Sequence, residues 1–414
     1  MKILITNTGP WGTGSFTVAN AVLHALIKMG HEVRLFFPDA GIDSKDINLY
    51  YDNKEIYKIW KFPIRNENFS IETFPLMIPD PHPRVPEHKR TYRELSESEF
   101  AFYYDCLRES LLQEIKDFQP DIVECQHIWT MEKIIEEAGI PYVCTAHHSD
   151  QMGFLYDERI QPIAIEAAHN AKYIFAISKY VAEEVVRLYN VSKDKVKIIT
   201  NGYDKEIFQK RELNRQEVLN HYCLDIPEDA TIFSFAGKIS KTKGIDILLK
   251  ANKLIESKEN IHFIILGSGK IEDVIDIDSK EEFLFDRVHF LGHRTMEELA
   301  EIHNICDFGI LPSRSEGFGI ACLESMACGL PLVSTSVGGL RDFVVGKLVP
   351  PANDNELASA ILKLAHLPYD QKIELSQKAL DVAQTFSWKA ITEERVKYYN
   401  QALGIETENL EKAS

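Results

Sequence analysis

Short apolar strands alternate with amphipathic helices along this chain, and that alternation constrains its fold more than any other feature. Residues 2–6 form the first predicted strand, and a glycine-rich loop and a helix from about Ser15 to Met29 follow it. Apolar side chains recur three and four positions apart in this helix, which ends at Gly30. The next predicted strand is 33–37. A strand, loop, helix and strand in this order predict parallel strands and an α/β fold.

The alternation runs in two series. The later strands of the first series are predicted at 120–125, 141–145, 171–177 and 196–200. Those of the second series are predicted at 231–236, 262–266, 288–291, 308–311 and 332–335. Between the two series, the charged stretch 205–230 has no predicted strand and is interpreted as a linker.

The two series predict two doubly wound Rossmann-like domains, which we expect to face each other across a cleft. The N-terminal domain spans residues 1–205 and the C-terminal domain residues 206–386. A last helix at about 387–403 is expected to pack back onto the N-terminal domain. Ligands of such sheets bind beyond the carboxyl ends of the strands. Two sheets therefore suit an enzyme with two substrates, although a fold alone does not fix a function.

Composition argues against several classes of protein. The 414 residues carry a formal net charge of −17, whereas a nucleic-acid-binding protein normally has a basic face. No stretch approaches 18 consecutive apolar residues, and the apolar run at the N-terminus is too short for a signal peptide. The seven cysteines are odd in number and include no C-x-x-C pair, which favours reduced thiols. We therefore expect a cytoplasmic protein.

A first motif lies between Pro312 and Pro331, where Glu316 and Glu324 flank a glycine-bracketed turn and the start of a short helix. Free backbone N–H groups at a helix N-terminus suit a phosphate. Carboxylates would repel a phosphate, so we expect the two acids to accept hydrogen bonds from sugar or ribose hydroxyls. The alternative for Glu324 is an acid that only stabilises the helix dipole.

A second motif follows a predicted strand that ends at Gly237. Lys238, Lys241 and Lys243 occur within the next six residues, before a helix. Clustered ammonium groups repel one another unless an anion joins them, so the cluster indicates a phosphate site, with a solvated basic loop as the alternative. The stretch is not a P-loop because it lacks the Gly-x-x-x-x-Gly-Lys-Ser/Thr order.

A third motif, His147, His148 and Asp150, follows another predicted strand. A lone histidine is usually structural, but two adjacent ones at a strand end in an expected cleft are as well explained by function.

The loop with Gly12 and Gly14 gives the main rival interpretation. It is an incomplete dinucleotide fingerprint, since Thr17 stands at the third glycine position, although Asp39 lies where a ribose-binding acid would. An NAD-dependent dehydrogenase built on these residues would leave the lysines and the paired glutamates without a role.

The segment around Glu316 and Glu324, with the Ser-Val-Gly-Gly-Leu340 loop after it, resembles the E-x7-E signature of family 4 glycosyltransferases. That family has the GT-B fold and retains the anomeric configuration of the sugar. The resemblance implies that Glu316 contacts hydroxyls of the donor sugar and that Glu324 binds the ribose of the nucleotide. Backbone groups between them are implied to face the diphosphate: Gly317, Phe318, Gly319 and Ile320.

The resemblance extends to the other motifs. It implies that Lys243, with Lys238 in place of the usual arginine, clamps the pyrophosphate after Gly237. His147 is implied to lie near the donor sugar and the transferring carbon. Arg294 is predicted to contact the base. The loop of Gly12 and Gly14 is implied to close over the diphosphate, and His148 and Asp150 are predicted to lie on the acceptor side.

The expected enzyme is a hexosyltransferase of carbohydrate biosynthesis that needs no cofactor and no metal, because lysines and a helix N-terminus neutralise the leaving diphosphate. We expect a uridine diphosphate sugar as donor and a hydroxyl of a saccharide, glycolipid or small molecule as acceptor. Asp276 and Asp278 resemble a metal-binding Asp-x-Asp, but their acidic surroundings argue against that role.

Two closer alternatives stay open: a GT-B sugar-nucleotide epimerase and a non-catalytic sensor of sugar nucleotides. Peripheral contact with the inner face of a membrane also stays open, because bases and aromatics mix between Lys54 and Arg65. An edge strand or loop whose lysines reach solvent explains that stretch more simply.

Overall fold

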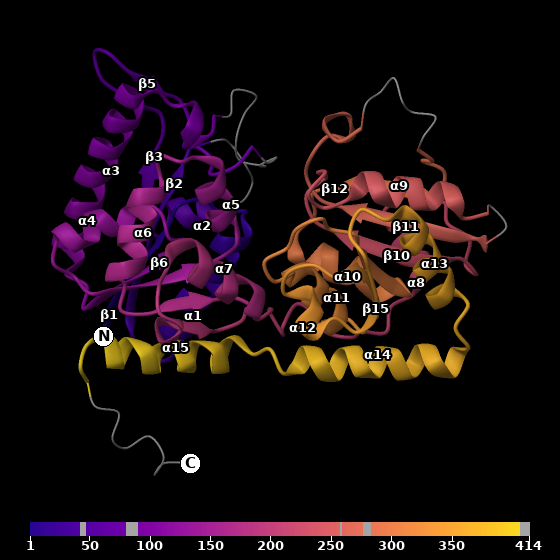
Figure 1. Ribbon diagram of the computed structural model, residues 1–414. Coiled ribbons are helices and arrows are strands. Elements are labelled where there is room, and N and C mark those ends of the chain that lie inside the picture. Colours follow the sequence, from indigo (N-terminus) through magenta and orange to yellow (C-terminus); the bar gives the residue numbers. More distant parts are fainter. Residues whose placement is uncertain (42–46, 80–89, 257–258, 276–282, 406–414) are drawn as a thin grey trace, which may run out of the picture. The chain divides into compact units, whose positions relative to one another are not determined.

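The computed structural model describes residues 1–41, 47–79, 90–256, 259–275 and 283–405, and Asp276 and Asp278 therefore lie outside the described residues. The chain divides into two compact units (Figure 1). Unit 1 comprises residues 1–201 together with the C-terminal segment from Trp388, and unit 2 comprises Gly202–Ser387.

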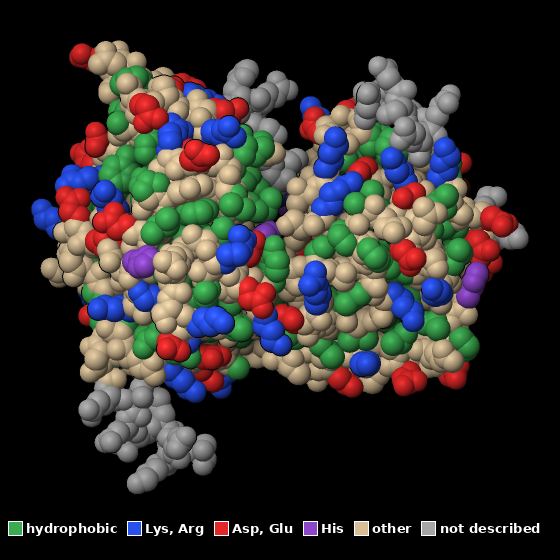
Figure 2. Space-filling view, viewed as in Figure 1, with side chains coloured by type: hydrophobic (Ala, Val, Ile, Leu, Met, Phe, Trp, Pro, Cys, Tyr) green, Lys and Arg blue, Asp and Glu red, His purple; other side chains and the backbone are tan. Residues whose placement is uncertain are grey.

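Charged side chains of both signs are intermixed on the face shown in Figure 2, so no single-sign surface dominates that view. All seven cysteines are free, and five of them are buried. Among the described residues, no helix is both long enough and apolar enough to cross a membrane.

Unit 1 is built on a seven-stranded sheet in the order β3-β2-β1-β6-β7-β8-β9, and every neighbouring pair in it is parallel. Its strands are β1 (Lys2–Asn7), β2 (Glu32–Asp39), β3 (Tyr57–Lys61), β6 (Ile122–Gln126), β7 (Tyr142–Ala146), β8 (Ile174–Ala176) and β9 (Val196–Ile198), with an antiparallel pair of β4 (Ile64–Arg65) and β5 (Ser70–Ile71) apart from it. Its helices are α1 (Gly14–Lys28), α2 (Ile47–Tyr51), α3 (Glu97–Phe118), α4 (Met131–Glu137), α5 (Ser149–Tyr156), α6 (Gln161–Asn170), α7 (Lys179–Tyr189) and α15 (Trp388–Ala402), with 3-10 turns η1 (Tyr92–Glu94) and η2 (Lys193–Lys195).

Local chemistry explains the ends of α1. The hydroxyl of Thr13 caps its first turn by accepting a hydrogen bond from the Phe16 N–H at 3.2 Å. Gly30 follows its end with φ of 85°, a conformation that glycine adopts without strain. The stretch from Lys54 to Arg65 contains the edge strand β3, where Tyr57 and Trp60 are buried, and the short strand β4. An edge strand agrees with the simpler interpretation of this stretch.

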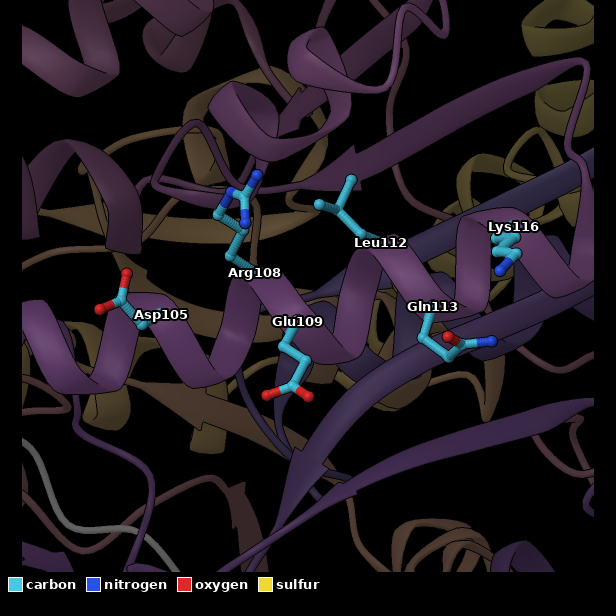
Figure 3. A pocket seen from close by; sticks show the side chains of 6 residues that line it. All are labelled: Asp105, Arg108, Glu109, Leu112, Gln113 and Lys116. Carbon is cyan, nitrogen blue, oxygen red and sulfur yellow. The ribbon is translucent and has the colours of Figure 1, made fainter. Parts of the chain in front are cut away.

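The surface of α3 carries a shallow hollow of about 450 Å³ (Figure 3). All the side chains that line it come from this one helix, and most of them are charged or polar: Asp105, Arg108, Glu109, Leu112, Gln113 and Lys116. A hollow along a single helix lacks the converging groups of a binding site.

Unit 2 is built on a six-stranded parallel sheet in the order β12-β11-β10-β13-β14-β15. Its strands are β10 (Thr231–Ala236), β11 (Ile261–Leu266), β12 (Val288–Gly292), β13 (Phe308–Leu311), β14 (Leu332–Thr335) and β15 (Gly346–Val349). Its helices are α8 (Arg215–His221), α9 (Ile245–Leu254), α10 (Met296–Ile305), α11 (Ile320–Ala327), α12 (Leu340–Phe343), α13 (Asp354–Ala365) and α14 (Tyr369–Gln384), with a 3-10 turn η4 (Ile271–Asp273). The predicted pair of parallel Rossmann-like sheets is confirmed.

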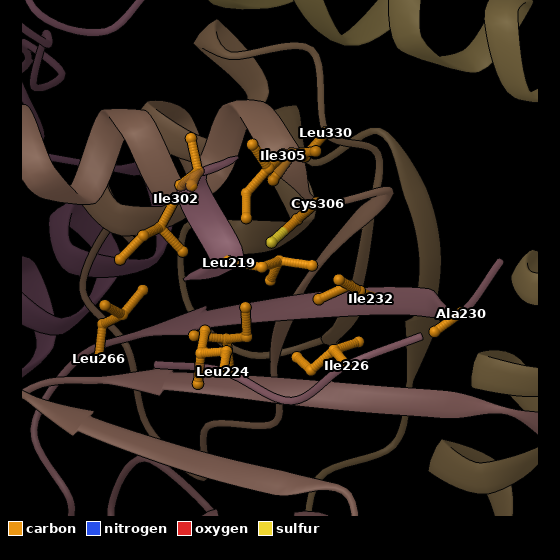
Figure 4. Packing of buried hydrophobic residues seen from close by; sticks show 12 residues of the cluster. Leu219, Leu224, Ile226, Ala230, Ile232, Leu266, Ile302, Ile305, Cys306 and Leu330 are labelled. Carbon is orange, nitrogen blue, oxygen red and sulfur yellow. The ribbon is translucent and has the colours of Figure 1, made fainter. Parts of the chain in front are cut away.

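The stretch 205–230 is not a linker, and that interpretation was wrong. It contains α8 and packs into the core of unit 2, as Figure 4 shows for Leu219, Leu224 and Ile226 against Ile302. Burying an aliphatic side chain of this size contributes about 1.5–3 kcal/mol. Charged residues around these few apolar ones hid the amphipathic pattern.

Strand order reverses once in each sheet, between β1 and β6 in unit 1 and between β10 and β13 in unit 2. The loops that leave the carboxyl ends of two strands diverge at such a point and leave room for a ligand. Each unit therefore has one favoured ligand position, set by topology alone.

Candidate functional site

At the reversal point of unit 2, the second and the first sequence motifs meet. Lys243 follows β10 and Glu316 follows β13, and Lys243 Nζ lies 2.6 Å from Glu316 Oε2. Ser313 Oγ lies 3.4 Å from the same carboxylate oxygen. Both charged side chains are largely but not fully buried, with exposed fractions of 23% and 13%. The pair thus stays accessible to a ligand while it is shielded enough for strong electrostatics.

Close backbone approach brings the loops after β10 and β14 against the loop that carries Glu316. A Cβ at Gly244 would lie 2.0 Å from the carbonyl oxygen of Pro312, and one at Gly338 would lie 1.6 Å from that of Glu316. Both glycines also have positive φ, so any other residue would be strained as well as clashing.

Arg314 joins the loop that carries Glu316 to the loop that carries Lys243, and the sequence analysis missed it. Its Nη1 and Nη2 donate to the two carboxylate oxygens of Asp246 at 2.7 and 2.6 Å. The backbone N–H of Arg314 donates to the Thr242 carbonyl at 2.7 Å. Nη1 also donates to the Lys241 carbonyl. Hydrogen bonds to Asp246 hold the pKa of Arg314 above its usual range. This two-point contact fixes the lysine loop against the Glu316 loop.

The N-terminus of α11 lies between the two glutamates. Gly319 has φ of 95° and precedes the helix, and the N–H groups of Phe318, Gly319 and Ile320 donate to no acceptor among the described residues. The Phe318 ring is buried and stacks on Phe343 with centroids 4.7 Å apart, which anchors the turn. These N–H groups, with the helix dipole, suit an anion.

Glu324 lies in α11 and is only partly exposed. Burial raises the pKa of its carboxyl to about 8, and the negative charge of Asp204 adds to the shift. No hydrogen bond or ion pair joins its carboxyl group to another described residue. A partly buried carboxyl without a protein partner is suited to hydroxyl groups of a ligand.

The other residues of the lysine motif, and Arg294, lie in loops that follow strands of the same sheet. Gly237 directly follows β10, Lys238 is half-buried, and Lys241 is exposed. Arg294 follows the edge strand β12, and its guanidinium lies 5.8 Å from the Tyr222 ring centre. The Arg294 Nε is buried without a described hydrogen-bond partner.

In unit 1, His147 follows β7, one strand from the reversal point. It is partly exposed, and its Nε2 lies 2.7 Å from the Oε1 of Gln126, the last residue of β6. Burial lowers the pKa of His147 well below its usual range, and the charges of His127 and Arg395 act in the same direction. His147 is therefore a neutral imidazole at neutral pH.

His148 and Asp150 are both bound to other residues of unit 1. His148 is buried with φ of 74°, and its Nδ1 lies 2.6 Å from Glu184 Oε2. Asp150 is fully buried, and its two carboxylate oxygens accept hydrogen bonds from the N–H groups of His147 at 2.9 Å and Ile128 at 3.0 Å. Asp150 thus holds the backbone around His147 and His148 is paired with Glu184, while contact of either residue with an acceptor stays a prediction.

The loop from Gly12 to Gly14 connects β1 to α1 at the reversal point of unit 1, and Gly12 has φ of 81°. Asp39 at the end of β2 is fully buried and accepts hydrogen bonds from the Tyr51 hydroxyl at 2.6 Å and the Gly41 N–H at 3.2 Å. A ribose would have to displace these donors, which argues against the dinucleotide interpretation.

One cluster of metal-ligand type occurs among the described residues. Potential ligand atoms of Cys125, Glu132 and Cys144 lie within 4.8 Å of one another, and all three residues are buried. Burial raises the pKa of both thiols, and Glu132 accepts hydrogen bonds from the Trp129 N–H. A metal would need thiolates, whereas the raised pKa values keep Cys125 and Cys144 as thiols. We therefore interpret the cluster as part of the core of unit 1.

Comparison with known proteins identifies related sequences for both units. Residues 221–381 match the family model of glycosyl transferases group 1, and residues 12–207 match that of glycosyltransferase family 4. The D-inositol 3-phosphate glycosyltransferase of Saccharomonospora viridis is 28% identical over 336 residues, covering 75% of this chain and 76% of that protein.

Solved structures match over nearly the whole chain. Sucrose-phosphate synthase from Thermosynechococcus elongatus superimposes with a TM-score of 0.74 at 20% identity and covers 98% of this chain and 100% of its own. Anabaena HepE in complex with UDP-glucose gives a TM-score of 0.72 at 16% identity and covers 97% and 100%. Likeness at this level of identity establishes the fold.

Proposed function

The chain belongs to glycosyltransferase family 4, and we propose that it moves a hexosyl group from a uridine diphosphate sugar to an acceptor hydroxyl, with retention and without a metal ion. That it transfers sugar and has the GT-B fold follows from the matching family models, relatives and solved structures. The dehydrogenase alternative is set aside by the same matches and by the occupied carboxylate of Asp39.

The contact between Lys243 and Glu316 carries the proposal. Without donor, each charge satisfies the other at 2.6 Å. A diphosphate that enters beside Lys243 would take over its ammonium group and leave the Glu316 carboxylate for hydroxyls of the donor sugar. One contact thus becomes two when the donor binds, one to each half of the nucleotide sugar.

The N–H groups of Phe318, Gly319 and Ile320 would add to Lys243 in stabilising negative charge on the departing diphosphate. Glu324 would accept hydrogen bonds from ribose hydroxyls, and Arg294 would contact the base. Lys238 would add a point charge rather than the two-pronged contact of an arginine. In this scheme, protein cations and dipoles supply the charge that a metal ion supplies elsewhere.

In the proposed mechanism, the sugar keeps its anomeric configuration because the acceptor attacks the face from which the diphosphate departs. The bond from the anomeric carbon to the diphosphate oxygen breaks as the bond to the acceptor oxygen forms on the same side. The acceptor hydroxyl proton passes to the departing phosphate oxygen, so no enzyme carboxylate serves as nucleophile. A glycosyl-enzyme intermediate trapped on any residue would overturn this step.

Uridine diphosphate is proposed because HepE, which shares the fold, binds UDP-glucose, and one relative is named for an inositol phosphate acceptor. The proposed acceptor is a hydroxyl group of a saccharide, a glycolipid or a small molecule. Seven free cysteines support a reducing, cytoplasmic site of action.

Thermal unfolding in EDTA tests the donor site directly. UDP, GDP, ADP, their common sugar conjugates and NAD are compared, and a ligand at about 100 times its Kd should stabilise the protein by about 2.7 kcal/mol. We expect UDP and one UDP-sugar to raise the Tm and NAD to leave it unchanged. Stabilisation by NAD alone, or by UDP only when a divalent metal replaces EDTA, would contradict the proposal.

A further inference from the structure

A buried carboxylate on β6 organises polar side chains from three elements of unit 1. Glu124 is fully buried, and its Oε1 accepts hydrogen bonds from Gln126 Nε2 at 2.7 Å and Thr145 Oγ1 at 2.7 Å. Arg395 Nη1 also donates to Oε1, and the Tyr399 hydroxyl donates to Oε2. Both of the last two residues come from α15, so the C-terminal helix completes the site around Glu124.

This arrangement fixes the orientation of the Gln126 amide. An ionised carboxylate only accepts hydrogen bonds, so the atom of Gln126 that faces Glu124 must be its NH2 group. The carbonyl Oε1 of Gln126 then faces His147 Nε2 at 2.7 Å. Because a carbonyl oxygen only accepts, Nε2 of His147 must carry the proton.

The tautomer decides what His147 can offer. His147 is neutral at neutral pH, so a proton on Nε2 leaves a lone pair on Nδ1. Nδ1 has no hydrogen-bond partner among the described residues, and it is not sealed from solvent. The His127 ring packs edge-on at 5.1 Å between centroids and limits rotation of the imidazole.

We propose that Gln126 is a positioning residue that holds His147 as the Nε2–H tautomer, so that Nδ1 accepts a hydrogen bond from a hydroxyl of the bound sugar. Glu124, held in turn by the C-terminal helix, fixes Gln126. The role of Nδ1 toward a sugar rests on the proposed function, whereas the tautomer rests on the protein alone.

Nuclear magnetic resonance of the imidazole nitrogens tests the tautomer without substrate. In the full-length protein labelled with ¹⁵N-histidine, couplings between ring protons and nitrogens show which nitrogen carries the proton. We expect the Nε2–H form at pH 7 for the signal that His147→Gln removes. An Nδ1–H or doubly protonated ring in the unaltered protein would overturn the proposal, and this measurement needs no folded Gln126 variant.

Gln126→Met then tests the cause, with Gln151→Met as the matched control. Gln151 is equally buried and lies in the same unit, but its Oε1 accepts from the backbone N–H of His148 rather than from a ring. We expect Gln126→Met to convert His147 to a mixture of tautomers, while Gln151→Met leaves the Nε2–H form. An unchanged tautomer in Gln126→Met would refute the assignment.

Kinetics on the UDP-sugar that stabilises the protein test the consequence. Loss of a residue that orients a metal-bound histidine typically costs 10- to 100-fold, and for Gln126→Met we expect a loss of similar size in kcat with little change in KM. A mixed tautomer with unchanged kcat would overturn the positioning role. Should no UDP-sugar turn over at all, the proposed function fails, while the spectra still decide the tautomer.

Discussion

Lys243→Met is the sharpest perturbation of the proposed donor site. Methionine keeps most of the apolar stem and removes the ammonium group that lies 2.6 Å from Glu316 Oε2. The backbone of the loop keeps its own supports, since Arg314 binds the Asp246 carboxylate and donates to the carbonyl groups of Lys241 and Thr242 independently of the Lys243 side chain. The variant should therefore lose charge at one point without losing the shape of the site.

The size of the effect follows from the surroundings of the ion pair. A charge-assisted hydrogen bond contributes about 1.5–3 kcal/mol, and the exposed fractions of 23% and 13% place this pair in a partly shielded environment. UDP affinity should then fall roughly 10- to 150-fold. More charge develops on the diphosphate as it departs, so kcat/KM should fall by about 10² to 10³, as for loss of one donor to a developing anion.

Calorimetric titration with UDP and release of UDP from the UDP-sugar measure these two effects. Lys241→Met is the control, because Lys241 lies in the same loop and is exposed. We expect it to change both quantities less than about twofold, in keeping with the small effect of an exposed charge. A loss below about tenfold in both measurements for Lys243→Met, or an equal loss for Lys241→Met, would refute the assignment of Lys243 to the diphosphate.

Three further predictions follow from the described contacts. Arg395→Met leaves the fully buried Glu124 without its cation and should lower the free energy of unfolding by about 3–5 kcal/mol in urea denaturation, and a loss under about 1 kcal/mol would contradict the pairing. Arg314→Met frees the lysine loop and should weaken UDP binding roughly tenfold, which calorimetry would disprove by finding the affinity unchanged. The pKa of Glu324 is about 8 in the folded state against an ordinary 4.5. Between these two pH values the folded protein holds a proton that the unfolded chain has released, so the free energy of unfolding falls as pH rises from about 4.5 to 8. Glu324→Gln should therefore gain Tm relative to the unaltered protein as pH rises through this window, and a constant Tm difference would contradict the raised pKa.

The sequence was informative where chemistry lies at strand ends. Lys243 and Glu316 are 73 positions apart, yet each lies in the loop that follows a predicted strand, and parallel topology brings such loops to one edge of the sheet. Glycines that permit close approach, such as Gly338, lie in the loops that the resemblance identified. Arg314 sits two residues before Glu316 and has a carboxylate partner, Asp246, at the start of α9. A search for opposite charges in the two loops could have found that pair.

Other parts of the site were beyond sequence reasoning. Glu124 and Arg395 are 271 positions apart, and no local pattern pairs a strand residue with a particular residue of the last helix. Adjacent histidines and an acid after a strand are equally typical of a catalytic site and of a satisfied core. In this structure Asp150 binds the backbone of the turn after β7, where His148 has a positive φ and pairs with Glu184, and no local pattern in the sequence predicts these contacts.

Both units keep functional side chains in a defined state before a substrate arrives, but they do so by different means. In unit 2, Lys243 and Glu316 neutralise each other, so under the proposed function binding of a diphosphate would exchange one ionic contact for two and leave little charge unpaired. In unit 1, Glu124 is permanently satisfied by its donors and acts on His147 only through Gln126. The Lys243–Glu316 ion pair would rearrange when a ligand binds, whereas the hydrogen bonds that join Glu124, Gln126 and His147 are fixed by folding. Substitutions at Lys243 should therefore be felt mainly in donor binding and departure of the diphosphate, and those at Gln126 mainly in kcat.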